Sequence, residues 1–229
     1  RVHHAINAEY LDKNFGQILI VWDKLFNTFQ LELVDVKPIY GTLRPVKTWN
    51  PIIINFKHVW QITKDAWYTE SIIDAFKIWF MPTGWRPEDV NQKFPLEEVN
   101  HPYNQIKYKT KNSTLMLAWS WFQHIIAGGM LFHLFTVMNV NSPSSLDYLY
   151  GMFIIVHIFS FTATLDYSKY CIVAELFKTI LGFYILYQQN KVWFNLTESL
   201  SIVVVLYLII SFILTVQFYS KSSNASTPT

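Results

Sequence analysis

The sequence contains few of the residues that stabilise small secreted or soluble domains. Only one of its 229 residues is cysteine, which excludes an internal disulfide framework and a metal site built from several thiolates. Charged residues make up 15% of the chain, well below the roughly one quarter that is usual for globular domains. It has no glycine-rich phosphate loop, serine-nucleophile motif or dinucleotide fingerprint. The net charge of +2, without a dense basic cluster, argues against nucleic acid as a partner.

Apolar residues are abundant instead, and they are concentrated in the second half. Residues 1–114 hold 14 of the 18 lysines and arginines, and 52% of the whole chain is hydrophobic. Crossing a bilayer takes about 20 consecutive, mainly apolar residues. Four stretches approach that length: 115–138, 148–165, 170–187 and 200–219. The pattern predicts an all-α integral membrane protein, a helical bundle with about four transmembrane helices.

The third of these stretches carries two charges, Glu175 and Lys178. Residues three apart share a face of a helix, so the two side chains are placed to pair. Charges within a span usually face the bundle interior and often mark function. A neutralising pair in a weakly hydrophobic helix is the alternative, and the sequence leaves both open.

The loops between the spans predict the orientation, because lysine and arginine stay on the cytoplasmic side. The segment before the first span is rich in both, whereas the connector 139–147 has neither. Lys169 and Lys221 fall on the first side again, and Lys191 falls on the other. We expect the N-terminal segment and the C-terminus on the cytoplasmic face of the endoplasmic reticulum in a eukaryote, or of the inner membrane in a bacterium.

Between residues 52 and 80 the apolar residues recur at helical steps of three, four and seven. This stripe comprises Val59, Ile62, Ala66, Ile73, Phe76 and Phe80, with tryptophans and lysines beside it. Aromatic rings and lysines together suit the bilayer interface, so we predict an interfacial amphipathic helix; an ordinary helix packed on a neighbour is the alternative. The expected organisation is a cytoplasmic-face region (1–114), transmembrane helices (115–219) and a disordered tail (220–229).

Adjacent histidines near the start of the sequence, His3 and His4, form a candidate metal site. Neutral imidazole is the commonest nitrogen ligand of iron and zinc, although a surface pair is the usual explanation for two neighbouring histidines. Short polar side chains that follow could orient the imidazoles by hydrogen bonds or could cap local turns. These candidates are Asn7, Asp12, Asn14 and Asp23. His58 is a weaker candidate, which either approaches the metal or faces lipid headgroups.

The residues around this pair resemble the third histidine box of the fatty acid hydroxylase and sterol desaturase superfamily. The similarity covers the histidine pair and Asn7, then Asp12-Lys13-Asn14-Phe15-Gly16, and then the segment from Trp22 to Phe29. Further similarity to the alkylglycerol monooxygenase branch lies in Ile39-Tyr40-Gly41-Thr42, Asn50-Pro51, the segment 56–60 and Pro82-Thr83-Gly84-Trp85. The family often has glycine where Asn27 stands.

The resemblance implies a membrane di-iron oxygenase in which His3 and His4 are iron ligands and O₂ hydroxylates a lipid C–H bond. In that branch the attacked carbon adjoins the ether oxygen, and the product falls apart to fatty aldehyde and glycerol. The implied partners are a lipid substrate, O₂, the bilayer and an electron donor, with tetrahydropterin the reductant in animals.

The family's two earlier boxes, H-x-x-x-H and H-x-x-H-H, are absent from these residues. We therefore expect the chain to be the C-terminal part of a larger enzyme, unable by itself to hold two irons or turn over substrate. Two alternatives remain: a sterol or fatty-acid hydroxylase or desaturase of the same superfamily, and a non-catalytic membrane protein.

Overall fold

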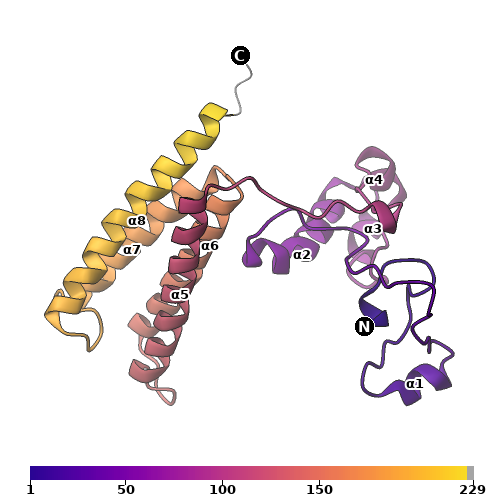
Figure 1. Cartoon of the computed structure of the whole chain (residues 1–229), viewed down its shortest axis with the longest axis horizontal. Coiled ribbons are helices and arrows are strands. Elements are labelled where there is room, and N and C mark those ends of the chain that lie inside the picture. Colours follow the sequence, from indigo (N-terminus) through magenta and orange to yellow (C-terminus); the bar gives the residue numbers. More distant parts are fainter. Residues whose placement is uncertain (226–229) are drawn as a thin grey trace. The chain divides into compact units, whose positions relative to one another are not determined.

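A computed structural model describes residues 1–225, with side-chain surroundings as far as Lys221. The described chain contains helices and irregular segments; within it, the only β pairing is an isolated bridge between Ala5 and Tyr40. It forms two compact units (Figure 1). The first comprises Arg1–Lys47 and Phe56–Tyr108, and the second comprises Thr48–Asn55 and the residues from Lys109 onward.

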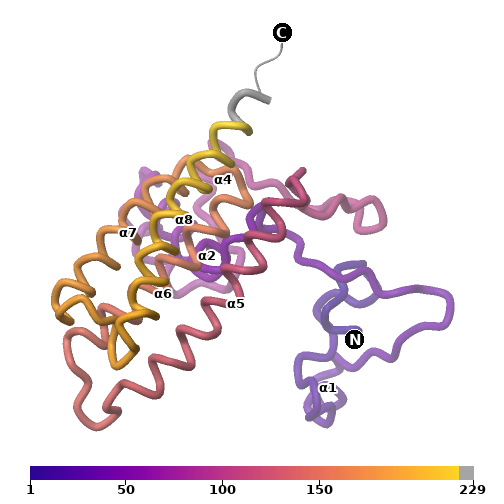
Figure 2. Tube along the Cα trace, turned by 60° about the vertical axis from the view of Figure 1, so that its left-hand side comes forward, coloured from indigo at the N-terminus to yellow at the C-terminus, as the bar shows by residue number. Residues whose placement is uncertain are grey.

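The second unit is a bundle of four long helices. They are α5 (Thr114–Val137), α6 (Ser145–Leu165), α7 (Tyr170–Gln188) and α8 (Glu198–Ala225). All four are long and apolar enough to cross a membrane. Helix α6 contacts the other three, and α7 also packs against α8, as Figures 1 and 2 show. The predicted all-α membrane bundle with four spans is confirmed.

Capping residues set the helix starts a few positions away from the apolar boundaries. Ser113 accepts a hydrogen bond from the Met116 amide at the start of α5. Ser144 and Asp147 form a reciprocal capping box at the start of α6, which satisfies two backbone donors that a helix leaves unpaired. Helix α8 continues to Ala225, past the expected end of the span, and residues 226–229 of the expected tail lie outside the described residues.

The apolar core of the bundle is centred on α6 and α7. Phe153, Ile185 and Leu208 are almost completely buried there, together with Trp193 from the connector before α8. Gly182 allows the helices to approach, because a β-carbon on it would lie 2.7 Å from Leu208 Cδ1 and 3.1 Å from Phe153 Cε2. A small residue at this position is what close helix packing in membranes requires.

The first unit has short helices joined by long irregular segments. Its helices are α1 (Ile20–Leu25), α2 (Pro51–Tyr68, of which the part from Phe56 lies in this unit), α3 (Ile72–Lys77), α4 (Glu88–Lys93) and the 3-10 turns η1 (Val2–His4) and η2 (Pro102–Asn104). The helical stripe predicted over 52–80 is therefore interrupted after Tyr68. Asp89 binds the Thr69 hydroxyl and the Glu70 amide there, and Ser71 caps a new helix.

Candidate metal centre

The histidine pair lies in a single 3-10 turn rather than in an α-helix. The centroids of the His3 and His4 rings are 4.0 Å apart, and the ring planes meet at 51°. The His4 side chain is exposed and that of His3 is partly buried. Partial desolvation, and then the neighbouring His4, lower the pKa of His3 below its ordinary value. A lowered pKa keeps more of the His3 imidazole neutral, which is the form that binds metals.

Backbone pairing with residues 39–41 fixes the position of this turn. The Ile6 amide donates to the Ile39 carbonyl at 2.9 Å, and the Gly41 amide donates to the His4 carbonyl at 3.4 Å. Val2 and Ala5 are buried on either side of the two histidines and pack with Tyr10. The apolar neighbours hold the backbone, so both imidazoles are left at the surface of the turn.

Asn7 is almost completely buried and completes the same pairing. Its Oδ1 accepts from the Ile39 amide at 3.1 Å, and its Nδ2 donates to Glu9 at 3.0 Å. The Tyr10 hydroxyl accepts from the Leu33 amide at 2.9 Å and donates to the Val36 carbonyl. Asn7 therefore positions the backbone around the histidine turn, and these hydrogen bonds go to Ile39 and Glu9, not to an imidazole.

Asp12 and Asn14 lie in a loop with left-handed backbone conformations, at φ of 55° and 57°. Asn14 binds both backbone groups of Gln30: its Nδ2 donates to the carbonyl at 2.7 Å, and its Oδ1 accepts from the amide at 2.9 Å. Its own amide donates to Thr28 at 3.0 Å. Asn14 thus ties this loop to the segment after α1. The Asp12 side chain is exposed.

Asp23 is the buried carboxylate of α1. Its Oδ2 accepts from the Gly16 amide at 2.9 Å, and its Oδ1 accepts from the Thr28 hydroxyl at 2.8 Å. A β-carbon at Gly16 would lie only 2.6 Å from the Leu19 carbonyl oxygen, so the close approach requires glycine. These contacts bring the two ends of the segment from Gly16 to Thr28 together around one carboxylate.

A pocket of about 360 Å³ lies beside the histidine turn. It brings together residues that the sequence singled out and several that it did not. The former are the candidate residues His3, His4, Asp12 and Asn14, with Lys13 and Phe15 from the same motif, and the latter include Leu11 and Gln17. His58 is exposed on α2 and does not line the pocket. The apolar lining residues carry no pattern of their own in the sequence, so only their proximity to the motif identifies them.

These residues fit part of a metal site. In the described chain no hydrogen bond engages the imidazole nitrogens of His3 or His4, so their donor atoms are accessible to a ligand. No group of three or more histidine, cysteine, aspartate or glutamate side chains that could hold a metal occurs among residues 1–225. Imidazole nitrogens are suitable ligands for iron, and two of them alone would be only part of such a site, on a turn that the surrounding residues fix.

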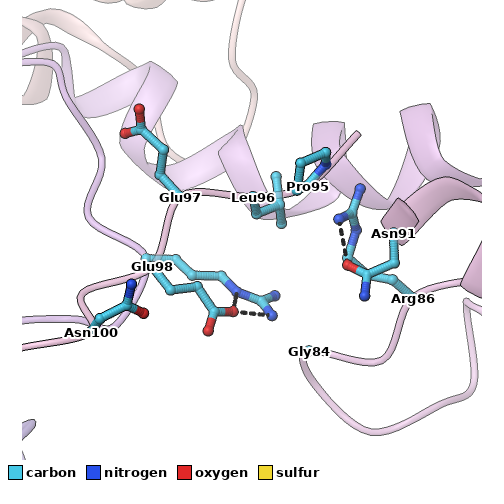
Figure 3. A pocket seen from close by; sticks show the side chains of 9 residues that line it. Gly84, Arg86, Asn91, Pro95, Leu96, Glu97, Glu98 and Asn100 are labelled. Carbon is cyan, nitrogen blue, oxygen red and sulfur yellow. Dashed lines mark hydrogen bonds and ion pairs between the residues drawn. The ribbon is translucent and has the colours of Figure 1, made fainter. Parts of the chain in front are cut away.

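A larger pocket of about 650 Å³ in the first unit is polar (Figure 3). Figure 3 shows Arg86 directed toward Asn91, to which it donates at 3.1 Å. Arg86 also forms a buried bidentate pair with Asp65, at 2.7 and 3.0 Å. Arg44, also in this pocket, pairs with Glu98 at 2.7 Å. Both arginines are already matched by carboxylates, so this pocket is less suited to binding an anion.

The bundle contains a buried polar cluster that the sequence showed only in part. Glu175 and Lys178 form an ion pair at 2.6 Å, with side chains at most 1% exposed. Around this pair, which lies on α7, are polar residues from the other three long helices: Gln123, His157, Ser160, Tyr207 and Ser211. We call these seven residues the bundle polar cluster. The ion pair is thus one element of a larger network of contacts between helices.

Gln123 is the common acceptor within this cluster. Its side-chain oxygen accepts from the Tyr207 and Ser211 hydroxyls, each at 3.2 Å. Its backbone carbonyl lies 3.0 Å from His157 Nε2, so that nitrogen carries a hydrogen. Lys178 donates to Ser211 at 2.8 Å. The donors converge on an amide oxygen, which can only accept hydrogen bonds. This arrangement suits a role in holding the helices together better than a role in proton transfer.

Known relatives were found by comparison with curated proteins. Human alkylglycerol monooxygenase is 39% identical over 87 residues, which cover 38% of this chain and 19% of the relative. The Caenorhabditis elegans protein of the same name is 36% identical over 96 residues, with the same two coverages, 38% and 19%. The Xenopus tropicalis protein is 25% identical over 146 residues, covering 64% of this chain and 32% of that protein.

The matched region thus spans about a fifth to a third of the length of these relatives (19% to 32%). No protein-family profile matches the chain, and no solved structure matches it. The resemblance that the residues around the histidine pair predicted is confirmed by these named relatives. The chain is a homologue of the alkylglycerol monooxygenases over part of its length.

Proposed function

We propose that this chain forms part of a membrane di-iron oxygenase that hydroxylates a lipid C–H bond, with alkylglycerols as the substrate class. The observation that carries the proposal is the histidine pair: two imidazoles with ring centroids 4.0 Å apart, at the edge of a pocket of about 360 Å³. The relatives named alkylglycerol monooxygenase support the reaction class.

The residues have distinct roles in this proposal. His3 and His4 would hold iron through their imidazole nitrogens. The iron, when bound, would supply the electron-transfer chemistry that activates O₂. Asn7 and Asn14 hold the backbone on either side of the pocket. Asp23 closes the segment from Gly16 to Thr28, which includes the pocket residue Gln17. Each of the three orients the histidine turn or the pocket wall through the backbone.

The proposed reaction inserts one oxygen atom of O₂ into the C–H bond next to the ether oxygen. The second oxygen atom leaves as water, with two electrons and two protons taken from a reductant. The resulting hemiacetal then divides into a fatty aldehyde and glycerol. Tetrahydropterin is the reductant that the resemblance suggests. A lipid substrate agrees with the four helices that are long and apolar enough to cross a membrane, and a cytoplasmic-facing site follows from the distribution of lysine and arginine.

A chimera tests the proposal. The segment of human alkylglycerol monooxygenase that matches this chain would be replaced by the corresponding residues of this chain. We expect the chimera to bind iron and retain alkylglycerol monooxygenase activity. His3→Ala and His4→Ala should each lower both by more than about tenfold, because metal ligands are lost. His58→Ala, outside the pocket, is the matched control and should leave both within about twofold.

Other outcomes would contradict the proposal in different ways. A chimera that is folded and iron-loaded but unaffected by His3→Ala and His4→Ala would exclude the histidine pair as ligands. A chimera that loads iron but oxidises a sterol or fatty acid in place of an alkylglycerol would favour the related hydroxylases. A folded chimera without iron or activity would favour a non-catalytic role for this segment.

A further inference from the structure

Helix α2 in the first unit buries polar side chains and exposes aromatic ones. Asp65, on one side of the helix, is buried against Arg86, and the two side chains are only 4% and 5% exposed. Gln61, one turn before Asp65, donates to its Oδ1 at 2.8 Å. The side of α2 that faces the rest of the first unit therefore carries a hydrogen-bonded ion pair at its centre, where most helices carry an apolar stripe.

The opposite side of α2 is apolar and is not covered by other residues of the first unit. Phe56, Trp60 and Trp67 are 64%, 60% and 83% exposed, and Thr63 lies between the two tryptophans in sequence. Steps of four, three and four residues place all four side chains on one side of a helix. We call these four residues the outer face of α2. Burying a large apolar side chain stabilises a protein by about 1.5–3 kcal/mol, and each of the three aromatic rings would lose that stabilisation if it remained in water.

This arrangement is the reverse of that in a helix on the surface of a water-soluble protein, where the apolar stripe faces the protein core. Basic residues border the outer face: the Lys64 ammonium lies 5.5 Å from the centre of the Trp60 ring, and Lys57 donates to the Pro45 carbonyl at 3.2 Å. Tryptophan and lysine together are typical of the boundary between lipid headgroups and acyl chains, where rings lie in the apolar part and ammonium groups reach the phosphates.

The start of α2, which belongs to the second unit, is capped and contacts α6. In the second unit, Asn50 caps α2 by accepting from the Ile52 and Ile53 amides at 3.0 and 3.2 Å. Its Nδ2 donates to the carbonyl of Phe159 on α6 at 3.2 Å. The preceding Trp49 amide binds Asp166, the residue that follows α6, at 2.9 Å. These contacts hold the first turn of α2 against the C-terminal end of α6 within the second unit.

We propose that the outer face of α2 is a lipid-binding surface that inserts into the interfacial layer of a phospholipid bilayer. The proposal rests on the inverted amphipathicity of α2 and on the lysines that border its outer face. It holds whether or not the chain takes part in an oxygenase, because it requires neither iron nor turnover. A second copy of the chain or another protein on this face would be a different occupant, and the test separates these from lipid.

Spin labelling of the full chain in phosphatidylcholine vesicles tests the proposal. Cys171 would first be replaced by alanine, since it is the single native cysteine and is buried. Trp60→Cys and Trp67→Cys would each receive a nitroxide, and Lys93→Cys, at an exposed lysine in the same unit, would be the matched control. Circular dichroism and size-exclusion profiles would verify that each variant is folded.

We expect labels at positions 60 and 67 to relax faster with dissolved O₂, which partitions into lipid, than with a water-soluble nickel chelate. The label at position 93 should show the opposite order. Equal access of the nickel chelate to positions 67 and 93 would overturn the proposal, because the face would then lie in water. Protection of positions 60 and 67 from both reagents would also overturn it, since a protein surface would then cover the face.

Discussion

The polar side chains near the histidine pair contact the backbone more than they contact one another. Asn14 binds both backbone groups of Gln30, and Asp23 binds the Gly16 amide and the Thr28 hydroxyl. Asn27 has a φ of 59°, a left-handed conformation that glycine adopts without steric cost. This conformation explains why glycine suits the position in the related family and why asparagine, which tolerates it, can replace glycine.

Asp23 supports a prediction about local stability. Asp23→Ala leaves the Gly16 amide and the Thr28 hydroxyl without their acceptor, at a cost of about 1–3 kcal/mol for each unsatisfied group that stays buried. We expect faster amide hydrogen exchange across residues 14–30, with exchange in the four long helices unchanged. Hydrogen exchange read by mass spectrometry on the full chain measures both. Asp35→Ala, at an exposed aspartate outside this segment, is the control, and equal exchange in the two variants would contradict the assigned role of Asp23.

The helices show which features a sequence can predict. The four spans were predictable because an apolar run of bilayer length has few alternative structures. The break between α2 and α3 was not, because it depends on Asp89, which lies about twenty residues further along the chain and binds Thr69 and Glu70. In the bundle polar cluster, Glu175 and Lys178 were visible as charges in an apolar run. Gln123 was not, because one amide in a span becomes informative only when its partners on other helices are known.

Lys178 supports a prediction about the packing of the four long helices. Lys178→Met leaves Glu175 buried without its partner, and breaking a buried pair in this way costs about 3–5 kcal/mol. Replacing both residues, in Glu175→Leu with Lys178→Met, removes both charges and should cost less than Lys178→Met alone. Reversible unfolding in detergent micelles measures these free energies as a double-mutant cycle. Lys191→Met, at an exposed connector lysine, should change stability by less than about 0.5 kcal/mol. A double variant whose cost equals the sum of the single variants would show that the two charges do not interact.

At the scale of the whole molecule, the two units differ in how much of their structure the sequence predicts. The bundle follows from composition alone, whereas the first unit is held by contacts between distant segments, such as Asn7 with Ile39 and Asp65 with Arg86. Hydrophobic periodicity carries no information about such pairs. The histidine pair was found through its motif, and the pocket beside it required the positions of Leu11 and Gln17, which the sequence did not mark.

Four spanning helices make a prediction about sidedness. An even number of crossings returns the chain to its starting side, so residues just before α5 and near the end of α8 should lie on the same side of the membrane. In a Cys171→Ala background, Lys111→Cys and Lys221→Cys should react together with a membrane-impermeant maleimide in sealed vesicles of one orientation. Asn141→Cys and Lys191→Cys, in the two connectors, should react only after the vesicles are opened or in vesicles of the opposite orientation. The excess of lysine and arginine before α5 predicts that the first pair lies on the cytoplasmic side. Reaction of positions 111 and 221 from opposite sides would mean an odd number of crossings, and α7, the helix that carries Glu175 and Lys178, would be the first candidate for one that does not span.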